Sequence, residues 1–221
     1  MNKKQMKHVL NVMGDMFPDA HCELNHTNPF ELTIAVLLSA QCTDEMVNRV
    51  TTSLFAKYKT PENYLAVPLE ELEHDIRSIG LFRNKAKHIQ KLCRMLIEQY
   101  GGEVPEQHEE LVKLPGVGRK TANVVVSNAF GVPAIAVDTH VERVAKRLGI
   151  ANWKDSVLEV EKKLMNKVSQ EEWTLTHHRL IFFGRYHCKA QQPQCDICPL
   201  LELCREGKKR MKSSKIRHVN P

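Results

Sequence analysis

Four cysteines near the C-terminus restrict the fold of this chain more than any other feature. They are Cys188, Cys195, Cys198 and Cys204, in the pattern C-x6-C-x2-C-x5-C. Four thiols so close together form disulfides, bind zinc or ligate an iron–sulfur cluster, and each outcome needs a different local structure. Disulfides are disfavoured, because the N-terminal segment MNKKQMKHVL lacks the apolar stretch of a secretory signal and a chain of 221 residues can bury a core without them.

The spacing of the four cysteines favours an iron–sulfur cluster over zinc. A structural zinc site usually takes two close pairs of ligands, and only one C-x2-C pair occurs here. Four thiolates from one compact loop suit a cubane cluster, in which each cysteine binds a different iron. Spacing alone leaves zinc, or thiols without any metal, as alternatives. Cys22, Cys42 and Cys93 are scattered along the chain and are expected to be small core residues.

The charge of the chain is concentrated at its C-terminal end. The formal net charge is +6, but residues 205–221 carry seven basic residues and one acidic residue, which account for all of it. Net charge is therefore no evidence that the body of the chain binds nucleic acid. Residues 207–221 are basic and lack apolar periodicity, so we expect a flexible tail. No apolar run approaches the roughly 18 residues of a membrane span.

Apolar residues are spaced at three and four positions in most of the chain, which predicts helices almost throughout. Asn28-Pro29 and Thr43 are residue types that start helices. The segment Asn84–Tyr100 is strongly periodic and Gly101-Gly102 should stop it, while Gly80 should end an earlier short helix in the left-handed conformation. Further helices are expected over residues 119–130, 141–148, 157–168 and 171–186. No segment alternates with period two for long enough to form a sheet, so the predicted fold class is all-α.

Two glycines lie directly before one predicted helix, in the segment Leu114-Pro115-Gly116-Val117-Gly118. Glycines allow backbone conformations closed to other residues, and they leave main-chain N–H groups unobstructed at a helix N-terminus, where anions bind. Arg119 and Lys120 follow at once and add positive charge. A packing turn between two helices is the commoner meaning of a lone G-x-G, so the turn by itself leaves both interpretations open.

Three motifs in order make this chain similar to a known family. They are LPGVGRKTANVV at residues 114–125, VDTHV at 137–141, and the four-cysteine loop. Together they resemble the endonuclease III family, the bacterial DNA glycosylases and AP lyases of the helix-hairpin-helix superfamily. The resemblance extends from about Phe30 to Cys204. It implies that the four cysteines hold a [4Fe-4S] cluster, which the spacing had left open.

The resemblance also implies two helical domains with a DNA-binding cleft between them. A six-helix barrel would span residues 22–132 and carry the helix-hairpin-helix motif at about 107–130. The iron–sulfur cluster domain would combine residues 1–21 with residues 133–206, and the basic tail would follow from 207 to 221. We expect a monomer in the bacterial cytoplasm, associated with the nucleoid.

Lys120 and Asp138 are the catalytic residues that the resemblance implies. Lys120 would attack C1′ of the damaged nucleotide and form a Schiff base, which a lysine can do only as the neutral amine. A phosphate contact is the alternative role for a lysine in such a loop. Asp138 would stabilise the charged sugar and assist proton transfer. Its position before a predicted helix also makes it an N-cap, and we expect it to have both roles.

Seven further positions are implied to contact DNA. A damaged base must leave the stack before it can be attacked, and protein side chains fill the gap. Gln41 corresponds to the family residue that faces the orphaned base, and Leu81 to the wedge in the opposite strand. The other implied contacts are Gly116, Gly118, Arg119, His140 and Lys189. The interval after Cys188 has only one charge, that of Lys189, so its phosphate contacts would rely on neutral amides.

The function implied is base excision repair of duplex DNA. The enzyme would be an N-glycosylase with AP lyase activity that removes oxidised or ring-saturated pyrimidines. An adenine glycosylase of the same fold is the first alternative, but it would lack a lysine at position 120 and carry a further C-terminal domain. A non-catalytic DNA-binding iron–sulfur protein is the second.

Overall fold

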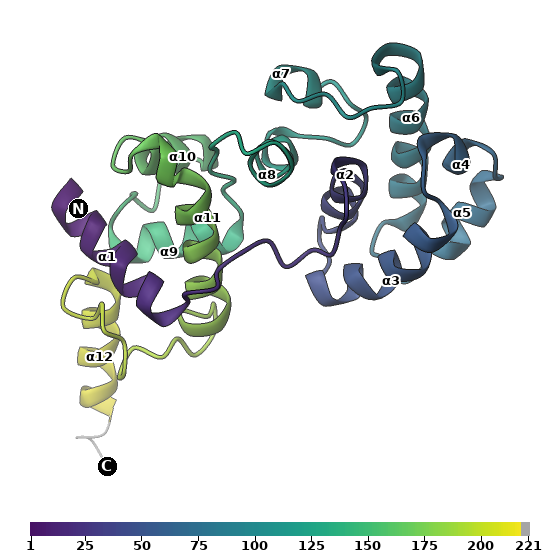
Figure 1. Cartoon of the computed structure of the whole chain (residues 1–221). Coiled ribbons are helices and arrows are strands. Elements are labelled where there is room, and N and C mark those ends of the chain that lie inside the picture. Colours follow the sequence, from purple (N-terminus) through teal and green to yellow (C-terminus); the bar gives the residue numbers. More distant parts are fainter. Residues whose placement is uncertain (218–221) are drawn as a thin grey trace. The chain divides into compact units, whose positions relative to one another are not determined.

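The structure, a computed structural model, describes residues 1–217, with side chains through Ser213. All regular elements in this part of the chain are helices, so the predicted all-α fold class is confirmed. The chain divides into two compact units (Figure 1). Unit 1 contains residues 1–21 and the chain from residue 133 onwards, and unit 2 contains residues 22–132. None of the described helices combines the length and apolar character that crossing a membrane requires.

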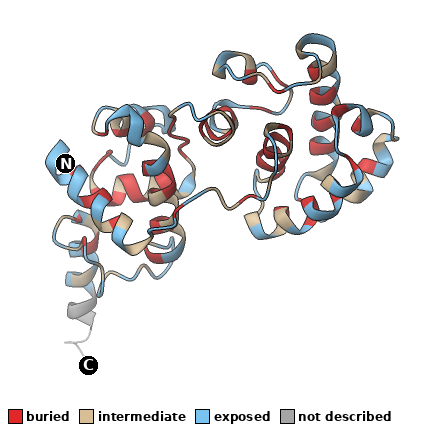
Figure 2. Cartoon of the chain, in the orientation of Figure 1, coloured by how far each residue is buried: buried red, intermediate tan, exposed pale blue. Residues whose placement is uncertain are grey.

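Unit 2 is organised around one almost completely buried helix, α2. Its sequence is apolar on all sides, and such a helix is stable only inside a core. Figure 2 shows it buried along its length. Asn28 caps its N-terminus by accepting a hydrogen bond from the Glu31 N–H at 2.9 Å. The helices of unit 2 are α2 (Pro29–Leu38), α3 (Asp44–Lys57), α4 (Pro61–Leu65), α5 (Leu69–Asp75), α6 (Phe82–Tyr100), α7 (His108–Leu111) and α8 (Arg119–Ala129).

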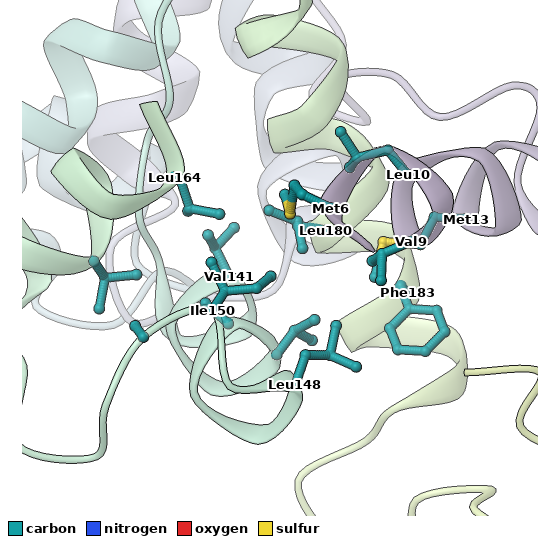
Figure 3. Packing of buried hydrophobic residues seen from close by; sticks show 14 of the residues in the cluster. Met6, Val9, Leu10, Met13, Val141, Leu148, Ile150, Leu164, Leu180 and Phe183 are labelled. Atoms are coloured by element: carbon teal, nitrogen blue, oxygen red, sulfur yellow. The ribbon is translucent and has the colours of Figure 1, made fainter. Parts of the chain in front are cut away.

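Unit 1 combines the N-terminal helix with the C-terminal part of the chain. Its elements are α1 (Lys3–Met16), α9 (Thr139–Leu148), α10 (Val157–Met165), the 3-10 turn η1 (Gln170–Glu172), α11 (Trp173–Phe182), the π-helical turn η2 (Phe183–His187) and α12 (Arg205–Arg217). Figure 3 shows the shared core, in which Met6 and Val9 of α1 lie among apolar residues of α9 and α11. Burial of this apolar surface is what joins the two ends of the chain in one unit.

The chain reverses near Gly80 in a different way from the prediction. Helix α5 already ends at Asp75, and the left-handed residue is Leu81, with φ of 60°, while Gly80 has no positive φ. The prediction for Gly80 was therefore wrong. Leu81 is the N-cap of α6, which begins two residues earlier than expected. Leu81 thus adopts a conformation that local preference would assign to a glycine.

The segment predicted as one helix over residues 171–186 consists of three elements. Helix α11 occupies its centre, and the chain widens into the π-helical turn η2 immediately before Cys188. A π turn inserts one extra residue into a helix, and such turns are frequent at functional sites. Here the turn leads directly into the four-cysteine loop, since its C-cap is Cys188.

The tail predicted as flexible is helical as far as the structure describes it. Helix α12 covers residues 205–217, and residues 218–221 of the predicted tail lie outside the described residues. The helix begins directly on the last cysteine, because the Gly207 N–H donates to the Cys204 Sγ at 3.2 Å. Ion pairs from Lys208 to Glu202 and from Arg210 to Glu206, both at 2.9 Å, add support. The prediction considered apolar periodicity and overlooked these local interactions.

Candidate DNA-binding and catalytic site

The turn between α7 and α8 in unit 2 has the helix-hairpin-helix form that the sequence predicted. Its backbone closes on itself, since the Val117 N–H donates to the Leu114 carbonyl at 3.0 Å. Gly116 has a φ of 81°, and a Cβ on it would lie 2.9 Å from Leu37 Cδ1 and 3.0 Å from His88 Cβ. Both its conformation and its packing against α2 and α6 therefore require glycine.

Gly118 differs from Gly116 in both respects. Its φ is −92°, which any residue adopts, and a Cβ there would meet no heavy atom within 4 Å. The expectation that both glycines need unusual backbone angles was therefore wrong for this one. Gly118 is the N-cap of α8 and provides no side-chain cap, so the first N–H groups of the helix face outwards without a Cβ beside them. That arrangement suits the close approach of an external anion.

Lys120 is exposed at the second position of α8, beside exposed Arg119. It forms no ion pair or hydrogen bond with the residues that the structure describes. The helix dipole adds positive potential at this end, and no acidic residue in the first turn of α8 offsets it. An amine in this position is accessible to a substrate that approaches the hairpin.

Gln41 and Leu81 occupy two neighbouring turns of unit 2 and share an unusual backbone conformation. Their φ angles are 56° and 60°, and the only other non-glycine residue with positive φ in the described part of the chain is Gln192. Both side chains are exposed, and the leucine is 57% accessible. The turns touch each other, since a Cβ on Gly80 would lie 3.6 Å from the Gln41 carbonyl oxygen. Because Leu81 is exposed, packing in the core does not explain why it is held in a strained conformation.

Asp138 begins α9 in unit 1, as predicted from its position. Its Oδ1 accepts hydrogen bonds from the backbone N–H groups of His140 at 2.9 Å and Val141 at 2.8 Å. Among the described residues, Oδ2 has no hydrogen-bond partner. One oxygen therefore fixes the orientation of the carboxylate by capping the helix, and the other remains available for chemistry.

His140 follows two residues later and is half-buried against η2. Burial lowers its pKa, and the guanidinium groups of Arg143 and Arg185 lower it further against the opposing charge of Asp138. The Arg143 Nη2 lies 3.3 Å from the His140 Nδ1 and donates to the Gly184 carbonyl at 2.7 Å. Because a guanidinium can only donate, His140 accepts at Nδ1 and is neutral in this contact.

Two arginines of α9 hold the beginning of the four-cysteine loop. Arg147 is buried, and its guanidinium donates to the carbonyls of Lys189 at 2.7 Å and Ala190 at 2.9 Å. Arg143 Nε donates to the Cys188 carbonyl at 3.2 Å. The exposed side chain of Lys189 is thus carried on a backbone fixed by α9. Sequence reasoning missed both arginines, and also Lys85 of α6, because a basic residue on a predicted helix is usually solvated.

The four cysteines of the loop influence one another electrostatically. No three metal-binding side chains in the described residues gather closely enough around one point to hold a metal ion. The thiols nevertheless interact with one another: burial, with the neighbouring thiols adding to it, raises the pKa values of Cys195 and Cys204, and raises that of Cys198 to about 11.

Hydrogen-bond donors already point at two of the four sulfurs. Arg147 Nη1 lies 3.4 Å from the Cys188 Sγ, and the Gly207 N–H lies 3.2 Å from the Cys204 Sγ. Such donors stabilise thiolates, the form in which cysteine binds iron. The donor set and its surroundings therefore fit the predicted [4Fe-4S] cluster.

The predicted site residues are divided between the units. Unit 2 carries Gln41 and Leu81 on two neighbouring turns, and the two hairpin glycines, Arg119 and Lys120 at the hairpin. Asp138, His140, Lys189 and the four cysteines belong to unit 1 and are linked through α9, η2 and the loop that follows.

Comparison with known proteins identifies the family. A family model described as HhH-GPD superfamily base excision DNA repair protein matches residues 34–170, and one described as the iron–sulfur binding domain of endonuclease III matches residues 188–204. The second match confirms the predicted [4Fe-4S] cofactor and covers the four-cysteine loop, and the assignment of these four cysteines as its ligands stays a prediction.

Individual relatives agree with these matches. Endonuclease III of Bacillus subtilis is 73% identical over 98% of this chain and 99% of the relative, and that of Escherichia coli K12 is 48% identical over 92% and 96%. A solved structure of a trapped covalent intermediate between endonuclease III and DNA superposes with a TM-score of 0.94 at 73% identity, covering 96% of this chain and 99% of that one. The chain therefore belongs to the HhH-GPD superfamily of base excision DNA repair proteins and, within it, to the endonuclease III family.

Proposed function

We propose that this protein is a bifunctional DNA repair enzyme, an N-glycosylase and AP lyase that removes oxidised or ring-saturated pyrimidines from duplex DNA. The observation that carries the proposal is the accessible amine of Lys120 at the head of α8, in a chain 73% identical to endonuclease III of Bacillus subtilis. A solved relative of the same identity forms a covalent intermediate with DNA. We further propose that the enzyme acts as a monomer on the DNA of the bacterial cytoplasm.

Lys120 supplies the nucleophile in this mechanism. Its neutral amine attacks C1′ of the damaged nucleotide, the C1′–N bond breaks, and the electron pair leaves with the base, which takes a proton. The sugar ring opens to a Schiff base at Nζ. Loss of a proton from C2′ then expels the 3′ phosphate by β-elimination. Each step transfers protons and electron pairs within the complex and requires no external oxidant.

Asp138 supplies the negative charge that these reaction steps need. Positive charge develops on the sugar as the base leaves, and a carboxylate of fixed orientation stabilises it more than it stabilises the neutral substrate. The capping bonds to Oδ1 provide that orientation without occupying Oδ2. The same carboxylate can accept and return protons during the opening of the ring.

The remaining proposed residues bind and distort the DNA. The uncovered N–H groups around Gly118, together with Arg119, would bind phosphates near the lesion. Gln41 and Leu81 would enter the space left by the extruded nucleotide. When bound, the cluster cross-links residues 188–204 through four thiolates and so fixes Lys189 and its loop against the backbone of the DNA.

The strand-cleavage pattern of the intact protein tests the function. A duplex with a ring-saturated pyrimidine should be cleaved at the lesion without added alkali. An adenine glycosylase would instead release adenine opposite 8-oxoguanine and leave the strand intact until alkali is added, and a non-catalytic DNA-binding protein would do neither. Cleavage that appears only after alkali at the pyrimidine lesion would contradict the lyase half of the proposal.

A further inference from the structure

We propose that Lys85 positions the two DNA-inserting turns of unit 2, holding Gln41 and Leu81 in the geometry in which they enter the duplex. The proposal rests on the function assigned above to Gln41 and Leu81. It assigns a role to a residue that does not itself contact the DNA, since the Lys85 side chain is buried and only 5% accessible.

Lys85 is bonded to both turns at once. Its Nζ donates to the Leu38 carbonyl at 2.8 Å and to the Ala40 carbonyl at 2.6 Å. Its own backbone N–H donates to the Leu81 carbonyl at 3.1 Å. The side chain thus holds the residue directly before Gln41, whereas the bond to Leu81 is the first main-chain bond of α6 and would form with any residue except proline at position 85.

The burial of this ammonium group is not explained by an ion pair. Lys85 forms none with the described residues, and a buried lysine without an acidic partner is rare because desolvation of the charge is costly. Burial accordingly lowers the pKa of Lys85. Its two acceptors are the carbonyl of Leu38, the last residue of α2, and the carbonyl of Ala40, which lies beyond the end of that helix. The first bond is an ordinary helix C-cap, but the shorter one, to Ala40, belongs to the turn.

The conformations of Gln41 and Leu81 need such a constraint. A non-glycine residue in the left-handed region costs on the order of 1 kcal/mol, and each of these two is exposed, so packing of their own side chains offsets none of that cost. Neutralising Lys85 would leave the two carbonyls unpaired and free to rotate. The turn would then relax towards unstrained angles and would carry the Gln41 side chain away from its inserting position.

The test compares two DNA substrates under single-turnover conditions. One carries a ring-saturated pyrimidine opposite adenine, and the other carries the same lesion opposite an abasic site, where no base pair has to be broken and no orphaned base has to be faced. Lys85→Met should lower the excision rate on the paired substrate by about tenfold and on the unpaired one by less than about threefold, because unpairing is what the inserted residues assist. Loss of stability alone would lower both rates equally.

Lys91→Met is the matched control. It removes an exposed lysine from the same helix, α6, and should leave both rates unchanged. If Lys85→Met does not fold, Lys85→Gln replaces it, because its amide can still reach one carbonyl, and it should show a smaller split of the same kind. Equal losses on both substrates, or no loss, in a folded Lys85 variant would overturn the proposal.

Gln41→Ala and Leu81→Ala separate this inference from the function on which it rests. If neither shows the split between paired and unpaired substrates, the insertion roles themselves are wrong. If both show it while Lys85→Met does not, only the role of Lys85 is wrong. Combining Lys85→Met with Gln41→Ala should add less than about threefold to the loss caused by Gln41→Ala alone, since Lys85 would act only through the position of Gln41 and coupled positions are not additive.

Discussion

The backbone of Gly184 lies against His140 so closely that a Cβ on it would be 3.0 Å from the Cβ of that histidine. The same Cβ would be 3.1 Å from Val144 Cγ2. Through this contact the π-helical turn η2 and the first turn of α9 fix each other's position. Asp138 caps that first turn, and Cys188 follows η2 directly, so the proposed carboxylate and the cluster loop share one point of support.

Gly184→Ala should therefore damage activity as well as stability. One methyl group must push η2 away from α9, at a cost of about 1–3 kcal/mol in unfolding free energy. Because α9 carries Asp138, the excision rate should fall further than the affinity for an abasic duplex. Denaturant unfolding and single-turnover kinetics measure the two effects. An alanine variant with wild-type excision and wild-type stability would show that this contact is not structurally important.

Substitution by alanine should lower stability by different amounts at the two hairpin glycines. Gly116→Ala forces a left-handed alanine against Leu37 and His88, so unfolding free energy should fall by about 2 kcal/mol or more. Gly118→Ala should cost less, about 1 kcal/mol, because the site is open and its φ is ordinary, so that only the loss expected for alanine at an N-cap remains.

DNA affinity, measured by fluorescence anisotropy, completes the comparison of these glycines. Gly118→Ala should weaken binding, because its methyl group would lie between the helix N–H groups and a phosphate. Wild-type affinity in Gly118→Ala would mean that the uncovered N–H groups of α8 do not bind the DNA backbone.

The two roles of Asp138 can be separated by two substitutions. Asp138→Asn keeps an oxygen that can accept from the His140 and Val141 N–H groups, whereas Asp138→Ala does not. Both should lose base excision by about a hundredfold or more, as expected when charge stabilisation in the transition state is removed. Only the alanine variant should also lose about 1 kcal/mol of stability from the missing cap. An asparagine variant with normal excision would restrict Asp138 to capping.

Acid should destabilise the protein through His178. Burial lowers the pKa of this residue from about 6.5 to about 4, with the neighbouring His21 adding to the effect. The unfolded chain therefore binds a proton between these values that the folded chain does not, so stability falls as pH drops below about 6.5 and the loss levels off near 4. At pH 5 the contribution is about 2 kcal/mol.

The variant that tests this is His178→Gln, compared with His8→Gln on the exposed face of α1. Between pH 7.5 and pH 5, His178→Gln should lose about 2 kcal/mol less unfolding free energy than the wild type. His8→Gln should behave as the wild type does. A wild-type response in His178→Gln would assign the acid sensitivity to other groups.

Local hydrogen bonding explains why many helix boundaries could be predicted. Asn28 and Thr43 cap α2 and α3 with their own side chains, so the signal lies within a few residues of sequence. The same kind of signal, the capping box of Asn2 and Gln5, marks α1 and was overlooked. Boundaries determined by distant contacts could not be predicted. Leu81 adopts the left-handed conformation expected of Gly80, and its turn abuts the one that carries Gln41, far away in sequence.

The residues of the candidate site likewise fall into some that could be predicted from the sequence and some that could not. The residue types at the hairpin, at Asp138 and in the four-cysteine loop carry their chemistry in short motifs, so a resemblance could assign them. Lys85 and Arg147 bind main-chain carbonyls of segments more than 40 residues away, and a carbonyl has no signature in a sequence. The π-helical turn η2 likewise leaves no sign, since one inserted residue hardly alters the apolar period.

Borohydride trapping on an abasic duplex tests the central role of Lys120 most directly. Reduction captures the enzyme on DNA only if an imine joins its amine to C1′, so the wild type and the control Lys91→Gln should give equal yields of covalent adduct. Lys120→Gln should give none, while binding the same duplex within about tenfold, or 1.4 kcal/mol, because DNA contacts are distributed over many phosphates. An undiminished adduct from Lys120→Gln would show that another amine is the nucleophile.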